Sequence, residues 1–284
     1  MQYHGRHEHI GGGMIRFVHR WIPEGSDPWA SIYLIHGLGD HGGRFDRLAR
    51  WFTRHGVEVS ALDLVGHGRS FGRRGCVESY ESILSEVNHF LRMRPSSSIS
   101  IPKFVFGQSM GGNLVLNWAL RFHSDIAGLI AAAPMLRPGN PPSESFMRIG
   151  RKISRWLPHL RMRASVDVQQ LTRDVHSQRA YTEDKLVHHQ ISLRLGTALV
   201  DSGLWALTHA DELSVPTLLV HGLNDQLTSP KASKEFADKN PEFVEIRLWN
   251  GLRHDLHSEP EWTSVLDDLR RWIAGKIASN HRRM

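Results

Sequence analysis

The chain of 284 residues is long enough to bury a full hydrophobic core, and its 40% hydrophobic and 23% charged content is typical of a soluble globular protein. No apolar run approaches the roughly 18 residues that a membrane span needs, and a single cysteine, Cys76, excludes an internal disulfide and suits a reducing compartment. The formal net charge of +6 favours anionic surfaces, but total charge bears on association and not on fold.

The first thirteen residues are polar and lack the apolar core of a secretory signal, so we expect a cytoplasmic protein. They carry His4, His7 and His9 beside a run of glycines. Three histidines on a terminus, with no other ligand near them in sequence, predict a tail that is disordered or leads into a strand, and not a metal site. Alternating apolar and polar residues at 14–21 then predict an antiparallel strand.

Predicted strands and helices alternate from residue 30 to residue 134. Such alternation implies right-handed crossovers and a parallel sheet that helices cover on both faces. Apolar runs predict strands at 30–35, 57–62, 104–106 and 126–133, and helical spacing of apolar residues predicts helices at 45–55 and 80–93.

The stretch FVFGQSMGGN, residues 104–113, predicts a strand that turns sharply into a helix. Ser109 stands at the tip of this turn, and Gly107 and Gly111, two residues away on either side, let strand and helix crowd together. The pattern fits the G-x-S-x-G nucleophile elbow, which holds its serine in a strained backbone conformation. Glycine-rich turns also cradle phosphates, and Ser109 could be only a helix cap, but partner residues downstream favour the elbow.

The alternation stops between residues 135 and 208, where several helical patterns occur without a strong strand. We expect residues 135–208 to form a helical cap that is inserted into an α/β core made of residues 1–134 and 209–284. After the insertion, apolar patterns predict strands at 217–220 and 243–249 and a closing helix at 261–278.

One helix of the expected cap is amphipathic, with apolar residues every three or four positions between Phe146 and Leu160. Such a basic helix could lie on an anionic membrane as a peripheral contact, or its apolar face could simply pack on the body of the protein. No nucleic-acid recognition motif accompanies the arginines, so we expect no nucleic-acid partner. The polar positions of this segment hold Arg148, Arg151, Lys152 and Arg155, and Arg161 and Arg163 follow.

A serine hydroxyl is a poor nucleophile near pH 7 unless a base removes its proton and a third group orients that base. Asp225 directly follows one late strand and His254 follows the next, so both stand at carboxyl ends of strands, as Ser109 does. The order Ser, Asp, His is that of the elbow fold. In that fold a second oxyanion donor comes from the loop after an early strand, where Leu38 is the best placed residue.

Both partners of the serine have rivals in the sequence. His221 is a rival base, but it is better interpreted as closing a strand, and His257 falls on the turn that leaves the His254 loop. Asp255 adjoins the histidine itself, and Asp63 lies on the other side of the elbow strand. Only Asp225 and His254 have the strand context that the chemistry needs.

With these residues in place, the sequence resembles the monoacylglycerol lipase and lysophospholipase branch of the α/β-hydrolases from about residue 8 to residue 275. The resemblance implies Ser109 as nucleophile, Asp225 and His254 as its partners, and the backbone N–H groups of Leu38 and Met110 as the oxyanion hole. It also implies hydrolysis of carboxylic esters through an acyl-enzyme, with no metal or organic cofactor. The motifs that carry it are HGLGDH (36–41), DLVGHGRS (63–70), GQSMGG (107–112), HGLNDQLTSP (221–230) and GLRHDLHSEP (251–260).

Two residues depart from the family pattern, because Gln108 stands where the family usually has His and Asp40 where it usually has Glu. The expected substrates are monoacylglycerols or lysophospholipid-like esters. A peptidase or amide hydrolase with the same triad is an alternative, since the fold hosts both chemistries. A catalytically silent protein that binds a ligand in the cavity is another, and the complete set of Ser109, His254 and Asp225 argues against it.

Overall fold

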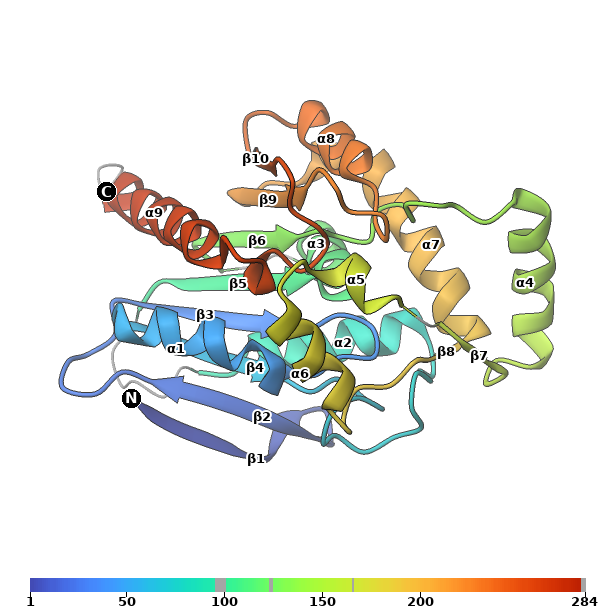
Figure 1. Ribbon diagram of the computed structural model, residues 1–284, viewed down its shortest axis with the longest axis horizontal. Helices are drawn as coiled ribbons and strands as arrows, with labels where there is room; N and C mark the ends of the chain where they lie inside the picture. The colour runs from blue at the N-terminus through green and yellow to red at the C-terminus, as the bar shows by residue number, and fades with distance from the viewer. Residues whose placement is uncertain (95–100, 123–124, 165, 282–284) are drawn as a thin grey trace.

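The structure, a computed structural model, describes residues 1–94, 101–122, 125–164 and 166–281. Its centre is an eight-stranded sheet with the strand order β1-β2-β4-β3-β5-β6-β9-β10 (Figure 1). The first two strands pair antiparallel and the remaining six run parallel. The expected fold class, a mostly parallel α/β-hydrolase sheet, is therefore confirmed.

The sheet strands are β1 (Gln2–Gly11), β2 (Met14–Ile22), β3 (Ala30–Ile35), β4 (Val57–Leu62), β5 (Lys103–Gln108), β6 (Gly128–Ala132), β9 (Thr217–Gly222) and β10 (Val244–Trp249). The helices outside the segment between β6 and β9 are α1 (Asp46–Arg54), α2 (Tyr80–Leu91), α3 (Met110–Arg121), α8 (Pro230–Lys239) and α9 (Trp262–His281). These bounds agree with the strands and helices predicted from the sequence to within a few residues.

Two hydrophobic cores lie on opposite faces of the sheet, because successive side chains of a strand point to opposite sides. In β3, Ile32 and Leu34 belong to the core beneath α1 and α9, whereas Tyr33 and Ile35 belong to the core beneath α2, α3 and α8. All six residues of β3 are buried. Burial on both faces explains why the sequence of β3 is a continuous apolar run and not an alternating one.

The N-terminal histidines lie in a regular strand. His4, His7 and His9 belong to β1, which pairs with β2 along its length. An ion pair of 2.9 Å between Glu8 and Arg20, and a hydrogen bond from His7 to the carbonyl of Arg69, hold this edge. The alternative of a disordered tail is therefore wrong.

The segment between β6 and β9 is mostly helical, as expected, but it also contains a two-stranded ribbon that the sequence did not indicate. Figure 1 shows this segment beside the sheet, with α4 at the outer edge. Within the described part of the chain, no helix has both the length and the apolar character that crossing a bilayer requires. The elements are α4 (Glu144–Trp156), β7 (Arg161–Arg163), α5 (Val168–Leu171), α6 (Val175–Glu183), β8 (Gln190–Ser192) and α7 (Leu193–Thr208).

Helix α4 packs on α7 through a narrow strip, and Met147 and Gly150 are its buried residues. Its large apolar side chains face outward: Phe146 is 54% exposed, Ile149 56% and Trp156 87%. The interpretation that the apolar face of this helix packs on the body is therefore wrong. The spacing of apolar residues does give α4 an apolar face, but no other part of the described chain covers most of that face.

Candidate active site

Ser109 occupies the sharp turn between β5 and α3, as the sequence predicted. Its backbone has φ 56° and ψ −115°, a region that residues with a side chain rarely adopt. The glycines two residues away are required by space, because a Cβ on Gly107 would lie 2.3 Å from the carbonyl oxygen of Gly111, and one on Gly111 would lie 2.1 Å from that of Ile35. The local sequence therefore fits a strained elbow.

Asp225 and His254, which lie 29 residues apart in the chain, meet beyond the carboxyl ends of β9 and β10. His254 Nδ1 donates to Asp225 Oδ2 at 2.7 Å, and both side chains are buried. This bond fixes the proton of the imidazole on Nδ1 and leaves Nε2 as the acceptor. The arrangement is the one that lets a histidine act as a general base.

The pKa values of this pair move apart. Burial would lower the pKa of His254, but the charge of Asp225 and the hydrogen bond to it outweigh burial, so the pKa of His254 is raised. Burial would raise the pKa of Asp225, but the two histidines that bond it hold the pKa of this carboxyl well below its usual range. Asp225 is therefore ionised at neutral pH and His254 is a strengthened base.

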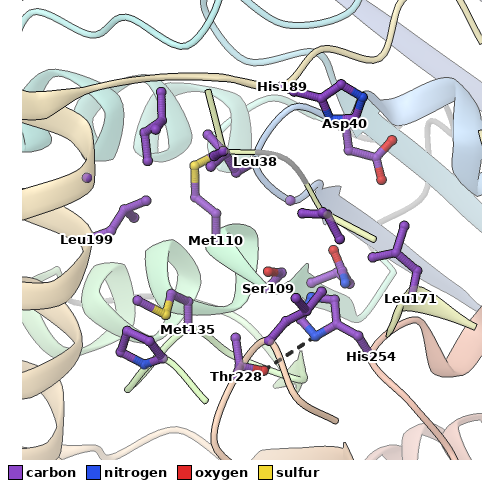
Figure 2. A pocket seen from close by; sticks show the side chains of 18 of the residues that line it. Leu38, Asp40, Ser109, Met110, Met135, Leu171, His189, Leu199, Thr228 and His254 are labelled. Carbon is purple, nitrogen blue, oxygen red and sulfur yellow. Dashed lines mark hydrogen bonds between the residues drawn. The ribbon is translucent and has the colours of Figure 1, made fainter. Parts of the chain in front are cut away.

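Ser109 and His254 line the same cavity of about 360 Å³. Figure 2 shows both side chains at the centre of its lining, with Met110 and Leu38 on one side. Among the described residues there is no hydrogen bond from Ser109 Oγ to His254 Nε2. Such bonds are often long in a ligand-free site and tighten when substrate binds.

Leu38 and Met110 also line this cavity, next to Ser109. Met110 is the first residue of α3, so its N–H has no acceptor within the helix. Leu38 lies in a turn that a bond from the N–H of Asp40 to the carbonyl of Gly37 closes at 3.3 Å, and its own N–H takes no part in that bond. Both residues therefore remain the candidates for the backbone donors that an oxyanion hole needs.

The rival residues have other contacts. His221 closes β9, as interpreted, and it also donates from Nε2 to Asp225 Oδ2 at 2.9 Å. His257 lies on the turn after His254, where its ring stacks on Phe45 with centroids 4.6 Å apart, and burial lowers its pKa to about 3. Asp63 lies away from the Ser109 cavity and bonds His19.

Thr228 is a residue of this site that the sequence analysis missed. Its hydroxyl donates to Asp225 Oδ2 at 2.7 Å and its N–H donates to Asp225 Oδ1 at 3.1 Å. The N–H of Leu227 donates to the same Oδ1 at 2.7 Å. An aspartate followed by a threonine three residues later is a turn pattern, and it was the signal available in the sequence.

The departure at residue 108 has a partner in the structure. Gln108 Nε2 donates to Asp255 Oδ1 at 2.8 Å, and burial raises the pKa of Asp255 to about 6. Arg44 lies 2.8 Å from Asp40 and 3.9 Å from Asp255. One end of the cavity is therefore polar, with two carboxyl groups held by an amide and a guanidinium.

Comparison with known proteins extends the likeness beyond the site. Residues 26–261 match the family described as serine aminopeptidase, S33. A monoacylglycerol lipase of Mycolicibacterium smegmatis is 28% identical over 274 residues, which are 95% of this chain and 97% of that protein. The crystal structure of the Paleococcus ferrophilus monoacylglycerol lipase is similar with a TM-score of 0.83 at 27% identity, over 93% of this chain and 100% of the other.

Another relative has a higher sequence identity to this chain but is a much longer protein. An uncharacterized abhydrolase domain-containing protein of Dictyostelium discoideum is 31% identical over 260 residues, which are 90% of this chain. The chain spans 27% of the length of that protein.

Proposed function

The chain belongs to the serine aminopeptidase S33 family, in the monoacylglycerol-lipase-like branch of the α/β-hydrolases, and we propose that it hydrolyses monoacylglycerols through Ser109, His254 and Asp225. The similarity to monoacylglycerol lipases makes it a carboxylic ester hydrolase. The observation that carries the proposal is the 2.7 Å bond between His254 and Asp225 at the cavity that also holds the strained Ser109.

In the proposed mechanism, His254 Nε2 takes the proton of Ser109 as the hydroxyl oxygen attacks the ester carbonyl. The N–H groups of Leu38 and Met110 hold the oxyanion that forms, an interaction worth about 3 to 4 kcal/mol per donor in comparable sites. His254 then gives the proton to the leaving alcohol, and water repeats the sequence to free the acid. Asp225 remains ionised throughout and orients the imidazole.

The lining of the cavity supports a lipid ester. Most of the lining away from Ser109 is apolar, and the segment 135–208 supplies much of it, which is why we assign this segment the role of a cap over the core. Such a surface suits an acyl chain, because each buried CH₂ contributes about 0.8 kcal/mol. The apolar residues include Met135, Pro142, Val166, Leu171, Ile191 and Leu199.

The polar end of the cavity favours a glyceryl head over a phosphate. Asp40, Gln108 and Asp255 line it, and none of the described lining residues is Lys or Arg. Carboxyl and amide oxygens accept hydrogen bonds from hydroxyl groups. The cation that pairs with the two carboxyl groups, Arg44, does not line the cavity, so the wall offers a phosphate acceptors and no cation. Among the expected substrates, this arrangement supports monoacylglycerols and not lysophospholipids.

The test compares hydrolysis of a glyceryl ester and a phosphoglyceryl ester that carry the same acyl chain. We expect kcat/KM for the glyceryl ester to be at least about tenfold higher, since a difference of 1.4 kcal/mol in transition-state binding suffices. Ser109→Ala is the control for the chemistry and should abolish both reactions and labelling by a fluorophosphonate probe. Full turnover by Ser109→Ala would end the proposal, and a folded wild type that resists the probe would favour the silent ligand-binding alternative.

Amide hydrolysis is the second candidate, because the matching family is described as a serine aminopeptidase. An aminopeptidase must hold the free amine of its substrate, and the carboxyl groups of Asp40 and Asp255 at the cavity wall suit a cation. Aminoacyl p-nitroanilides assayed beside p-nitrophenyl esters of matched size decide between the two. Faster turnover of the anilides would replace the lipase proposal.

Contact with an anionic membrane through α4 is a further part of the proposal. The exposed apolar side chains of α4, Trp156 above all, lie on the same helix as Arg148, Lys152 and Arg155, which are exposed. A helix with these two faces binds in the interface of an anionic bilayer, where a monoacylglycerol resides. Arg151 is paired with Asp201 and contributes less charge.

Sedimentation with vesicles tests this contact. We expect binding to phosphatidylglycerol vesicles that falls with added salt and is weaker for phosphatidylcholine vesicles. Trp156→Ser should weaken it, whereas the matched control Phe71→Ser, at a side chain 67% exposed outside α4, should not. Equal binding by both variants would contradict a membrane surface on α4.

A further inference from the structure

A cluster of two histidines and one aspartate lies outside the Ser109 cavity. His19 of β2, His41 of the loop after β3 and Asp63 after β4 are all buried, and one ligand atom of each lies within 4.8 Å of the others. His19 Nε2 is 3.1 Å from Asp63 Oδ1, close to the spacing of two ligand atoms on one tetrahedral metal ion. The three side chains come from separate parts of the chain.

His41 presents an unused nitrogen to this cluster. Its Nε2 bonds Asp184 Oδ2 at 2.8 Å, which places the ring proton on Nε2 and leaves a lone pair on Nδ1. Nδ1 is buried, and no described residue gives it a hydrogen-bond partner. A histidine whose far nitrogen donates to a carboxylate is the usual arrangement around a protein-bound metal.

His19 has a second contact of the same kind. Its Nδ1 is 2.9 Å from the hydroxyl of Tyr3, so this nitrogen can carry the proton and donate it to the hydroxyl oxygen. Nε2, which is hydrogen-bonded to Asp63 Oδ1 in the structure, would then carry a lone pair for the metal, and the metal would replace that hydrogen bond. Asp63 Oδ1 accepts the N–H of Gly42 at 2.7 Å, and its second lone pair, which faces His19 Nε2 at 3.1 Å, would bind the cation instead.

Two glycines keep the space between these side chains open. A Cβ on Gly43 would lie 3.0 Å from His41 Nδ1 and 3.2 Å from His19 Cε1. A Cβ on Gly42 would lie 2.9 Å from His19 Cδ2 and 3.3 Å from Asp63 Oδ1. A side chain at either position would crowd the cluster, so the loop needs glycine at both.

We propose that His19, His41 and Asp63 form a structural binding site for one Zn²⁺ ion, with Asp184 as the partner that orients His41. Two imidazoles, one carboxylate and a water complete a tetrahedral shell, and imidazole ligands suit zinc better than calcium or magnesium. The atoms must draw together by about 1 Å to reach zinc distances. The ion takes no part in ester hydrolysis.

Such an ion would connect the loop that carries Leu38 to the rest of the fold. His41 lies three residues after Leu38, His19 and Asp63 are fixed on β2 and after β4, and Asp184 belongs to the segment 135–208. Binding would therefore stabilise the position of this loop relative to its neighbours. A metal that binds only the folded state raises the melting temperature by an amount that grows with the logarithm of its affinity.

The experiment titrates metal-free protein with Zn²⁺ and measures stoichiometry by mass spectrometry of the metal and affinity by competition with a chromophoric chelator. We expect one equivalent per chain, with a higher melting temperature and the d–d bands of a tetrahedral ion when Co²⁺ replaces Zn²⁺. His41→Gln should weaken binding at least about 100-fold, and Asp184→Asn by about 10- to 100-fold. The side chain of Asp184 is 24% exposed and that of His41 only 6%, so the Asp184 variant tests the site even where His41→Gln does not fold.

Two controls separate this site from other ligands in the chain. Asp167→Asn removes an exposed carboxylate of the same segment, and it should bind zinc as the wild type does. The triple variant His4→Gln, His7→Gln and His9→Gln removes the exposed histidines of β1 and should also bind one equivalent. The proposal would be overturned by any of three results. These are loss of zinc binding in the triple variant, wild-type affinity in both His41→Gln and Asp184→Asn, and no zinc binding by the wild type.

Discussion

Replacing Ser109 with glycine should make the protein more stable than replacing it with alanine. Ser109 has φ 56° and ψ −115°, a conformation that costs about 1 to 3 kcal/mol for a residue with a Cβ and little for glycine. Glycine in turn loses about 0.5 to 1 kcal/mol more backbone entropy on folding. The difference leaves Ser109→Gly more stable than Ser109→Ala by about 1 kcal/mol.

Both variants lack the hydroxyl, so the comparison isolates the backbone strain from the chemistry. Equilibrium unfolding in urea measures the free energies, and 1 kcal/mol corresponds to about 2 °C in the melting temperature of a chain of this size. Ala119→Gly in α3 is the matched control, because glycine in a helix interior costs about 1 kcal/mol.

The test depends on the sign of the difference in unfolding free energy between glycine and alanine at residues 109 and 119. Glycine should stabilise at residue 109 and destabilise at residue 119. A Ser109→Gly protein no more stable than Ser109→Ala would show that the elbow stores no strain, and the account of why the nucleophile stands at this turn would fail.

Three further predictions concern the triad and its surroundings. Asp225→Asn should lower kcat by about 10⁴-fold, as in comparable triads, because the NH₂ group of the asparagine would face the donors that converge on the Asp225 carboxylate. A kcat near that of the wild type would contradict an orienting role for Asp225. Thr228→Val removes one of those donors and makes the Asp225 carboxylate more basic, which raises the pKa of His254. The acid limb of the kcat/KM profile should therefore move to higher pH, and an unmoved limb would contradict a role of Thr228 in setting the basicity of Asp225. His257 has a pKa of about 3 in the fold against about 6.5 unfolded, so its contribution to stability is lost as pH falls below about 6.5. Between pH 7.5 and pH 5 the wild type should lose about 2 kcal/mol more unfolding free energy than His257→Phe, and equal losses would refute the buried neutral ring.

The positions of Ser109, Asp225 and His254 were accessible from the sequence for a physical reason. Parallel strands end at the same edge of a sheet, so residues that directly follow three such strands are brought near one another whatever the lengths of the connections. The strands themselves were buried apolar runs, which are easy to locate. Order along the chain and sheet direction therefore sufficed to predict that His254 and Asp225 bond each other and that Ser109 lines the same cavity as His254.

Contacts that depend on side-chain packing were not accessible. Gln108 and Asp255 lie 147 residues apart and bond each other, and no local pattern marks that pair. The exposed face of α4 was missed for a related reason. Periodicity shows that a helix has an apolar face, but only the packed structure shows whether anything covers it.

The two histidines on Asp225 provide the last test, because they differ in what their second nitrogen does. His221 Nε2 donates to Asp225 and its Nδ1 bonds the hydroxyl of Ser233 at 2.8 Å, so both nitrogens are occupied, and burial lowers its pKa. His254 uses only Nδ1 for Asp225, lines the cavity beside Ser109, and has a raised pKa. A general base needs a free nitrogen that faces the nucleophile.

We therefore expect His254→Gln to abolish ester hydrolysis, and His221→Gln to retain most of it with a shifted pH profile. Residue 221 acts through Asp225, and glutamine can still donate a hydrogen bond to that carboxylate. Rates measured between pH 5 and pH 9 on one ester would separate the two roles. If both variants fold and lose activity equally, His254 cannot be assigned as the base and His221 as a residue that only supports Asp225.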